Sequence, residues 1–155
     1  MTEVRVSIVD VYVLRRGPAE LEALCLRRAR GTRCAGTWET VHGHIQPGEA
    51  PAAAARRELR EETGLAPARL YNLSRVETFY LHKTDELALI PVFAAIVDGA
   101  AAITLSHEHD GFEWLPIGQA GQRMAWPREG RALADVVKLL GDGTAGGLED
   151  VLLVQ

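Results

Sequence analysis

Three glutamates lie close together in a segment whose composition favours a helix. Glu58, Glu61 and Glu62 follow the alanine run at residues 52–55, and Gly64 provides a stop signal after them. At 100° per residue, a helix places the three carboxylates within an arc of about 100°. Carboxylates this close repel one another unless they take up protons or share a cation. The spacing therefore indicates a site for a divalent cation on one edge of the helix.

The chemistry of the donor atoms narrows the choice of cation. All of them are carboxylate oxygens, with no cysteine and no paired helical histidine, and such a set favours Mg²⁺ or Mn²⁺ over Zn²⁺. Mg²⁺ keeps several waters and takes further ligands from substrate oxygens, which suggests phosphate chemistry. The alternative is a solvated helix whose RRELREE run forms salt bridges, including one between Arg57 and Glu61.

The residues before the helix favour the catalytic interpretation. Gly43 is followed by five residues and Glu49, and seven further residues lead to the run RELREETGL at 57–65. This segment resembles the whole signature of the Nudix hydrolases, GX5EX7REUXEEXGU, in which U is an aliphatic residue. Nine specified positions over 23 residues match without a departure. Because so many positions are specified, the resemblance is specific.

The resemblance implies a fold, an activity and a cofactor. Nudix hydrolases have an α/β fold, an α/β/α sandwich with a mixed central sheet, and we expect residues 1–155 to form one such domain. They hydrolyse a nucleoside diphosphate linked to another group X with the aid of Mg²⁺, which Mn²⁺ can replace. The expected partner is therefore a small nucleotide or another diphosphate substrate.

The resemblance also implies roles for the acids of the motif. Glu58 and Glu62 correspond to the principal metal ligands. Glu61 corresponds to a further ligand, direct or through water, with a part in catalysis. The backbone carbonyl of His42, just before the first glycine, is another candidate metal ligand.

Supporting and catalytic groups are expected beside these ligands. By the resemblance, Glu49 anchors the loop through hydrogen bonds and Arg57 orients an acid at the catalytic centre. Glu108 is the candidate general base, because the run LSHEH at 105–109, followed by WLP at 114–116, resembles the (S)xEH...WL segment of two Nudix subgroups. These are the dinucleoside tetraphosphate hydrolases and the bacterial dihydroneopterin triphosphate or dATP pyrophosphohydrolases. The alternative is that Glu108 is an ordinary loop acid.

The choice between the two subgroups depends on a few residues. The runs GHIQPGE at 43–49 and SHEH at 106–109 are similar to the tetraphosphate hydrolases, which usually have Pro-Lys where this chain has Val41-His42. The segment at residues 38–41, which precedes the glycine-rich loop, resembles the corresponding segment of the pterin and dATP subgroup. A (d)NTP-type pyrophosphohydrolase is therefore preferred, and a dinucleoside tetraphosphate hydrolase is the alternative.

Three residues outside the acidic cluster are candidate substrate contacts. Arg28 is one because a guanidinium can bind two phosphate oxygens together. The indole of Trp38 could stack on a base, with core packing as the alternative. His44, in the glycine-rich loop, is the third candidate.

Composition limits the class of partner. The 17 Lys and Arg against 21 Asp and Glu give a net charge of −4, so no nucleic acid polymer is expected, although the arginines at 27–33 keep RNA 5′-end pyrophosphohydrolysis as an alternative. With no signal peptide and no apolar run of bilayer length, we expect no membrane and a cytoplasmic location. A homodimer is compatible with the sequence. A catalytically inactive Nudix module that senses a ligand or binds a protein is the alternative of another class.

A sheet and a helix must bring these residues together. Apolar and β-branched runs predict strands at 4–14, 21–26, 70–81 and 87–97, with short strands at 103–105 and 112–115. Helices are predicted from Pro51 to the stop at Gly64 and over 128–140. The tail from about residue 141 has a flexible composition, although residues 151–154 could pack on the surface or add a strand.

Overall fold

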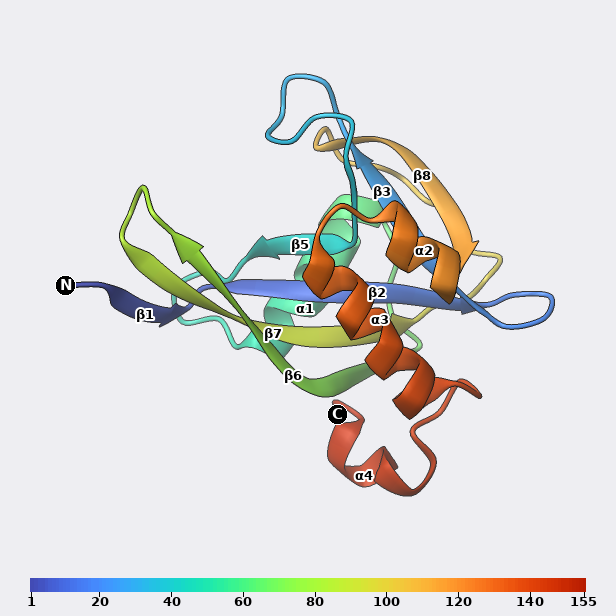
Figure 1. The fold of residues 1–155 in the computed structure, drawn as a ribbon. Coiled ribbons are helices and arrows are strands. Elements are labelled where there is room, and N and C mark those ends of the chain that lie inside the picture. Colours follow the sequence, from blue (N-terminus) through green and yellow to red (C-terminus); the bar gives the residue numbers. More distant parts are fainter.

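The centre of the molecule is a mixed sheet of eight strands (Figure 1). The computed structural model describes every residue from Met1 to Gln155. The strands are β1 (Glu3–Val6), β2 (Ile8–Arg16), β3 (Leu21–Arg28), β4 (Trp38–Glu39), β5 (Val41–His44), β6 (Arg69–Leu81), β7 (Glu86–Ile96) and β8 (His109–Pro116). The sheet has the order β1-β7-β2-β3-β4, with β5 also paired to β2, β6 to β7 and β8 to β3.

Strand β7 organises the sheet because it makes both parallel pairings. Its first residues pair with β1 and its later ones with β2, while β6 forms the long antiparallel hairpin predicted from the sequence. The single strand expected over 4–14 is wrong in one respect, since it is interrupted at Ser7. Val6 pairs with Leu89 but Asp10 pairs with Val92, so the first segment has one residue more than β7 over this stretch. That extra residue divides β1 from β2, as a β-bulge does.

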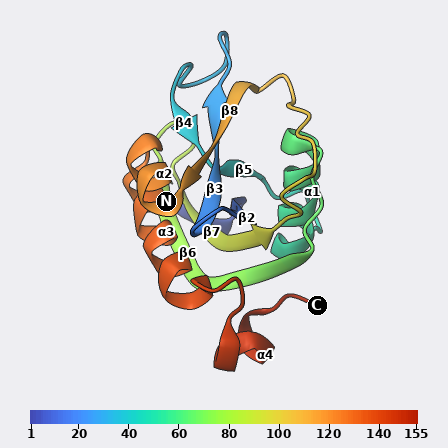
Figure 2. The same ribbon diagram turned by 90° about the vertical axis from the view of Figure 1, so that its right-hand side faces the viewer.

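Helices cover both faces of the sheet. Helix α1 (Pro51–Thr63) lies on one face, and α2 (Ile117–Arg123) and α3 (Pro127–Leu140) lie on the other (Figure 2). Each interface has its own apolar cluster, one including Leu59 of α1 and one including Leu133 of α3. The α/β/α sandwich with a mixed sheet is thus confirmed. No helix combines the length and apolar character needed to cross a lipid bilayer.

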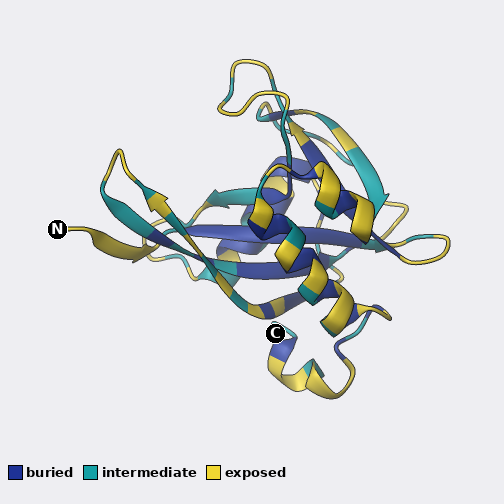
Figure 3. Cartoon of the chain, in the orientation of Figure 1, coloured by how far each residue is buried: buried dark blue, intermediate teal, exposed yellow.

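Strand β2 lies between the two clusters and is buried almost throughout (Figure 3). Val11 packs in the cluster under α1, and its neighbour Tyr12 packs in the cluster under α3. This follows from the alternation of side chains along a strand. A central strand covered on both faces is accordingly an almost continuous apolar run.

Helix α1 begins and ends where the sequence predicts. Pro51 occupies its first turn, where a missing N–H is tolerated. Gly64 ends it with a left-handed φ of 74°, and its N–H donates to the Arg60 carbonyl at 2.8 Å. Leu59 is completely buried, so the apolar side of the helix faces the sheet and its acids lie along an edge.

The loop between β7 and β8 is held against the end of α1. Residues 103–105, expected as a strand, have no regular structure and instead pack beside the helix. The Thr104 N–H donates to the Thr63 carbonyl at 2.8 Å, and the Ser106 N–H reaches the Glu62 carbonyl at 3.4 Å. The last carbonyl groups of a helix have no partner within the helix. The N–H groups of this loop bond to those carbonyls, whereas in a strand they would bond to a neighbouring strand. Residues 106–109 therefore lie next to α1.

The C-terminal region has more regular structure than its composition suggests. Helix α2 was not predicted from the sequence, and its short length leaves little apolar periodicity to detect. The tail from residue 141, expected to be flexible, contains a 3-10 turn (Gly146–Leu148) and α4 (Glu149–Leu152). Leu152 is buried in the cluster under α3, and Leu153 forms an isolated bridge with Tyr71 of β6. Burial of Leu152 explains why the tail packs on the domain.

A buried polar network connects α3 to the sheet. The Arg128 Nε donates to Asp10 Oδ2 at 2.8 Å, and His42 Nδ1 lies 2.6 Å from Asp10 Oδ1. Burial alone would raise the pKa of Asp10, but the contacts with His42 and Arg128 lower it. Glu129 accepts hydrogen bonds from the N–H groups of Thr40 and Trp126, which fixes the first turn of α3.

Replacing Arg128 by Leu is expected to lower the free energy of unfolding by about 1–3 kcal/mol, because the completely buried Asp10 carboxylate keeps only its His42 partner. Urea denaturation at neutral pH measures the loss. Arg131→Leu is the matched control, since the Arg131 side chain is more than half exposed and its ion pair with Glu77 is long, at 3.8 Å. Equal losses in both variants would contradict the assignment.

Candidate active site

Arg57 fastens the glycine-rich loop to helix α1. Its guanidinium donates to both carboxylate oxygens of Glu49, each at 2.8 Å, and to the His44 carbonyl at 2.9 Å. It also donates to Glu58 at 2.6 Å and lies 3.2 Å from Glu61. The Arg57 hydrogen bond, with one from the Gln46 N–H, lowers the pKa of Glu49 to about 2. Glu49 thus has the contacts of a residue that anchors the loop, and Arg57 has the contacts of one that orients Glu58.

Glu58 lies directly against the backbone of Gly43. A side-chain carbon at Gly43 would overlap the carboxylate carbon and both carboxylate oxygens of Glu58. Only glycine leaves this space, which explains why the residue type is needed on β5. Burial raises the pKa of Glu58 more than the charge of Arg57 lowers it.

Gly43→Ala is expected to displace the Glu58 carboxylate and to lower kcat on the order of tenfold, because a small misplacement of a catalytic group has a large effect on rate. Steady-state kinetics with saturating Mg²⁺ measures the change. Gly118→Ala is the control, since a side-chain carbon there meets nothing within 4 Å. Wild-type kinetics for Gly43→Ala would show that the position of Glu58 is unimportant.

Glu62 is the most strongly perturbed acid of the site. Its side chain is 3% exposed, and neither carboxylate oxygen has a hydrogen-bond partner. Its pKa is raised well above the ordinary value by burial first, and then by the negative charges of Glu108 and Glu58. A buried carboxylate without a partner is unfavourable when ionised. The position therefore needs either a proton or a cation.

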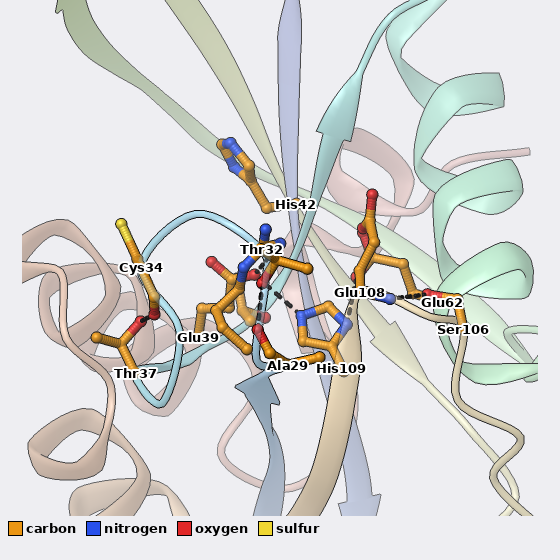
Figure 4. Close-up of polar contacts among 12 residues, drawn as sticks. Ala29, Thr32, Cys34, Thr37, Glu39, His42, Glu62, Ser106, Glu108 and His109 are labelled. Carbon is orange, nitrogen blue, oxygen red and sulfur yellow. Dashed lines mark hydrogen bonds and ion pairs between the residues drawn. The ribbon is translucent and has the colours of Figure 1, made fainter.

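The loop before β8 brings Glu108 and His109 to Glu62. One ligand atom from each of these residues lies within 4.8 Å of the other two. The Glu108 N–H donates to Ser106 Oγ at 3.3 Å, and its carbonyl accepts from the Ala29 N–H at 2.9 Å. The backbone on both sides is therefore held, while the Glu108 side chain reaches the cluster (Figure 4).

Two residues that the structure places at this site, His109 of the cluster and its partner Glu39, are not among the site residues predicted from the sequence. His109 is buried, with Glu39 on one side of its ring at 3.0 Å and Glu62 on the other at 3.9 Å (Figure 4). Burial alone would raise the pKa of Glu39, but the hydrogen bond with His109 and the charges of His42 and Arg28 lower it. One feature of the sequence could have pointed to Glu39: it is an acid within the short apolar run that precedes the glycine-rich loop. An acid buried in such a run usually has a partner.

The candidate substrate contacts lie in different places. Arg28 donates to Glu39 at 3.2 Å and to the Arg33 carbonyl at 2.9 Å, so it lies behind His109. Trp38 packs on the cluster under α2 and α3, between the guanidinium groups of Arg27 and Arg123. The structure therefore brings Arg28, but not Trp38, to the face of the sheet that is covered by α1, the helix with Glu62.

The other expected residues lie near α1 with their side chains apart. The ring of His42 turns away from Glu62 (Figure 4). Its Nδ1 atom lies 2.6 Å from Asp10 Oδ1. The side chain of His44 is exposed, and its carbonyl is held by Arg57. Glu61 is 55% exposed and paired only with Arg57. Glu62 and Glu108 are consequently the acids that lie together, with Glu58 held against Gly43 beside Arg57.

These residues fit a divalent cation. The unpartnered oxygens of Glu62 are buried beside a second carboxylate, and hard oxygen donors of this kind suit Mg²⁺ or Mn²⁺. A bound cation would balance the charges that otherwise raise the pKa of Glu62. The arrangement as a whole is a carboxylate site at the junction of α1, β5 and the loop before β8.

The fold and this carboxylate site define a class of protein. The family profile of the NUDIX domain matches residues 4–136, which is most of the chain. The chain therefore belongs to the Nudix family, as the motif at 43–65 indicated.

Sequence comparison finds relatives with different names. An asymmetrical bis(5′-nucleosyl)-tetraphosphatase of Mus musculus is 34% identical over 87 residues, which cover 55% of this chain and 59% of that protein. The enzyme of the same name from Sus scrofa is 30% identical over 104 residues, covering 66% of this chain and 69% of that protein. An octanoyltransferase of Myxococcus xanthus is 40% identical over 121 residues, covering 75% of this chain but 32% of that protein. The chain thus spans from about a third to two thirds of these relatives.

Solved structures share the fold at lower identity. An Ap4A hydrolase of C. elegans in a binary complex superimposes with a TM-score of 0.71 and 22% identity, covering 86% of this chain and 96% of that chain. The dihydroneopterin triphosphate pyrophosphohydrolase of E. coli gives a TM-score of 0.69 and 19% identity, covering 89% and 99%. The NUDIX domain of Shewanella oneidensis NrtR, complexed with ADP ribose, gives 0.70 and 15%, covering 89% and 88%.

Proposed function

We propose that this chain is a Nudix pyrophosphohydrolase that cleaves a phosphoric anhydride bond in a small nucleotide. The observation that carries the proposal is the buried, unpartnered carboxylate of Glu62 beside Glu108, with Glu58 held near it against Gly43. Glu58 and Glu62 would hold a divalent cation, Mg²⁺ or in its place Mn²⁺. Glu61 through water and the His42 carbonyl are the further candidate ligands. Such a cation, when bound, would neutralise charge on the phosphate oxygens.

Hydrolysis of an anhydride requires a base next to the reacting phosphorus. The oxygen of a water molecule bonds to phosphorus, the bond from phosphorus to the bridging oxygen breaks, and the water gives up a proton. Glu108 is proposed to take that proton, because its side chain lies in the cluster while its backbone is held on both sides. Arg57 keeps Glu58 in position and is in turn fixed by Glu49.

The relatives favour a dinucleoside tetraphosphate as substrate. Two of the relatives described above carry the name bis(5′-nucleosyl)-tetraphosphatase, and the SHEH run at 106–109 supports the same subgroup. A nucleoside triphosphate is the second candidate, because the segment at 38–41 resembles the pterin and dATP subgroup. His44 is proposed to contact phosphate, since its side chain is exposed at the end of β5 beside the acids. Arg28 is already engaged with Glu39 and the Arg33 carbonyl, so it supports the site from behind His109.

The experiment is a substrate panel with Mg²⁺, with Mn²⁺ and with a chelator. It includes diadenosine tetraphosphate, the dNTPs, dihydroneopterin triphosphate, ADP-ribose and a triphosphorylated RNA 5′ end. Products are identified by chromatography, and hydrolysis in ¹⁸O-labelled water shows which phosphorus is attacked. We expect cation-dependent cleavage of diadenosine tetraphosphate to ATP and AMP with the largest kcat/KM. A larger value for dNTPs, with release of pyrophosphate, would select the second candidate.

The panel also separates an enzyme from a ligand-sensing or protein-binding module. A sensor would bind one of these nucleotides without converting it, and calorimetry on the same samples detects such binding. The complete set of motif acids favours an enzyme, because all three helix glutamates are present. Binding without turnover under every metal condition would contradict the proposed activity.

A further inference from the structure

His109 has an unusual environment for a histidine packed inside a domain. Its side chain is completely buried, and its Nδ1 atom has no hydrogen-bond partner. Buried polar atoms are almost always paired, so an orphaned ring nitrogen needs an explanation. The nearest acidic oxygen, on Glu62, lies 3.9 Å away and is itself unpartnered. Both orphaned groups therefore border the same space.

The other ring nitrogen of His109 is held firmly. His109 Nε2 lies 3.0 Å from Glu39 Oε1, and Arg28 donates to the same oxygen at 3.2 Å. Glu39 Oε1 accepts the Arg28 hydrogen bond, and as an acceptor it pairs with the N–H of a neutral imidazole, which places the ring proton on Nε2. This leaves the lone pair of Nδ1 directed away from Glu39 and toward Glu62 and Glu108.

We propose that His109 Nδ1 is a nitrogen ligand for a divalent transition-metal ion that it shares with Glu62 and with one carboxylate oxygen of Glu108, whose second oxygen remains available as the base. The proposal rests on the proposed metal site and adds a donor to it. The chain Arg28–Glu39–His109 has the carboxylate-histidine order that commonly supports a metal-bound imidazole, because the carboxylate holds the tautomer and the ring orientation. An imidazole and two carboxylates within 4.8 Å of one another match the donor types that transition metals accept.

A nitrogen donor changes which cation the site prefers. Mg²⁺ binds oxygen donors almost exclusively, whereas an imidazole suits transition metals, and Mn²⁺ accepts both donor types. The site should therefore bind Mn²⁺ more tightly than Mg²⁺, with His109 responsible for part of the difference. Glu39 and Arg28 are positioning residues in this scheme, since they act through the ring of His109.

The direct test is electron spin echo spectroscopy of Mn²⁺ bound to the full chain. We expect a nitrogen coupling that changes when the protein is labelled with ¹⁵N-histidine. His109→Gln should abolish the coupling, because glutamine has no atom in the place of Nδ1. The glutamine amide can still reach Glu39, so that contact is kept. The variant should also bind Mn²⁺ on the order of ten to a hundredfold more weakly by calorimetry, with a smaller change for Mg²⁺.

His107→Gln is the matched control, because that neighbouring histidine is exposed and belongs to no cluster. It should keep both the coupling and the wild-type affinity. If His109→Gln does not fold, the spectrum of the wild-type protein still decides. Bound Mn²⁺ without any nitrogen coupling would overturn the inference and leave the proposed hydrolase intact. No binding of Mn²⁺ or Mg²⁺ and no hydrolysis would instead overturn the proposed function.

Discussion

Glu62→Gln lowers kcat on the order of a hundredfold or more, if Glu62 is the central ligand of the proposed metal site. The substitution keeps the shape of the side chain and removes only its charge, so the loss measures electrostatic stabilisation of the transition state. Single-turnover kinetics at saturating Mg²⁺ with the best substrate of the panel gives the rate. Glu113→Gln is the control. It also removes one carboxylate, but that carboxylate pairs with Arg123 and lies outside the cluster.

The same variant should be more stable than the wild-type protein when a chelator is present. The pKa of Glu62 is raised in the folded state, so the folded chain holds a proton that the unfolded chain releases more readily. Wild-type stability is therefore highest below the unfolded pKa and falls as pH rises through the folded pKa. Gln cannot ionise, so the difference in Tm should grow as pH rises above the ordinary pKa of a glutamate. An unchanged kcat, or a Tm difference that shrinks with pH, would remove Glu62 from the proposed role.

Glu108→Gln is expected to lower kcat on the order of a hundredfold or more while Tm stays near the wild-type value. The loss follows from removal of a general base, and the unchanged stability follows because the loop is held by backbone contacts to Ala29 and Ser106. The rate of the variant should rise more steeply at high pH than that of the wild type, since hydroxide then replaces the missing base. A pH–rate profile of kcat measures this.

Asp110→Asn is the control for Glu108, because Asp110 is a nearby exposed acid that pairs with Arg27. It should have wild-type kinetics. Wild-type activity in Glu108→Gln would place the general base elsewhere in the site. A large drop in Tm would show instead that Glu108 is a structural residue of the loop.

The motif helix could be predicted because its determinants are local. Pro51 at the first turn, the alanine run and Gly64 at the end act within a few residues, and they define α1 as observed. The spacing of Glu58 and Glu62 on one side of that helix is likewise a property of helix geometry. The long hairpin of β6 and β7 was also predictable, since its two apolar strands are separated by a short polar turn.

Other parts of the site depend on contacts between distant residues. Glu39 and His109 are 70 positions apart, and nothing in either local sequence indicates that they touch. Trp38 was a candidate base contact, but its place on β4 turns it to the face opposite Glu39. The loop over 97–108 has no regular structure, so its path along the end of α1 comes from capping of that helix.

Local sequence was enough to establish the family and the helix that carries the acids, and it indicated a cation site among them. The tertiary structure decided which acids face one another: Glu62 and Glu108 in a buried cluster, Glu58 against Gly43, and Glu61 toward solvent. It also decided that His109 joins them. The physical reason is that spacing along a helix places side chains only relative to its own axis, whereas burial and partners depend on what the sheet and the loop before β8 bring against it.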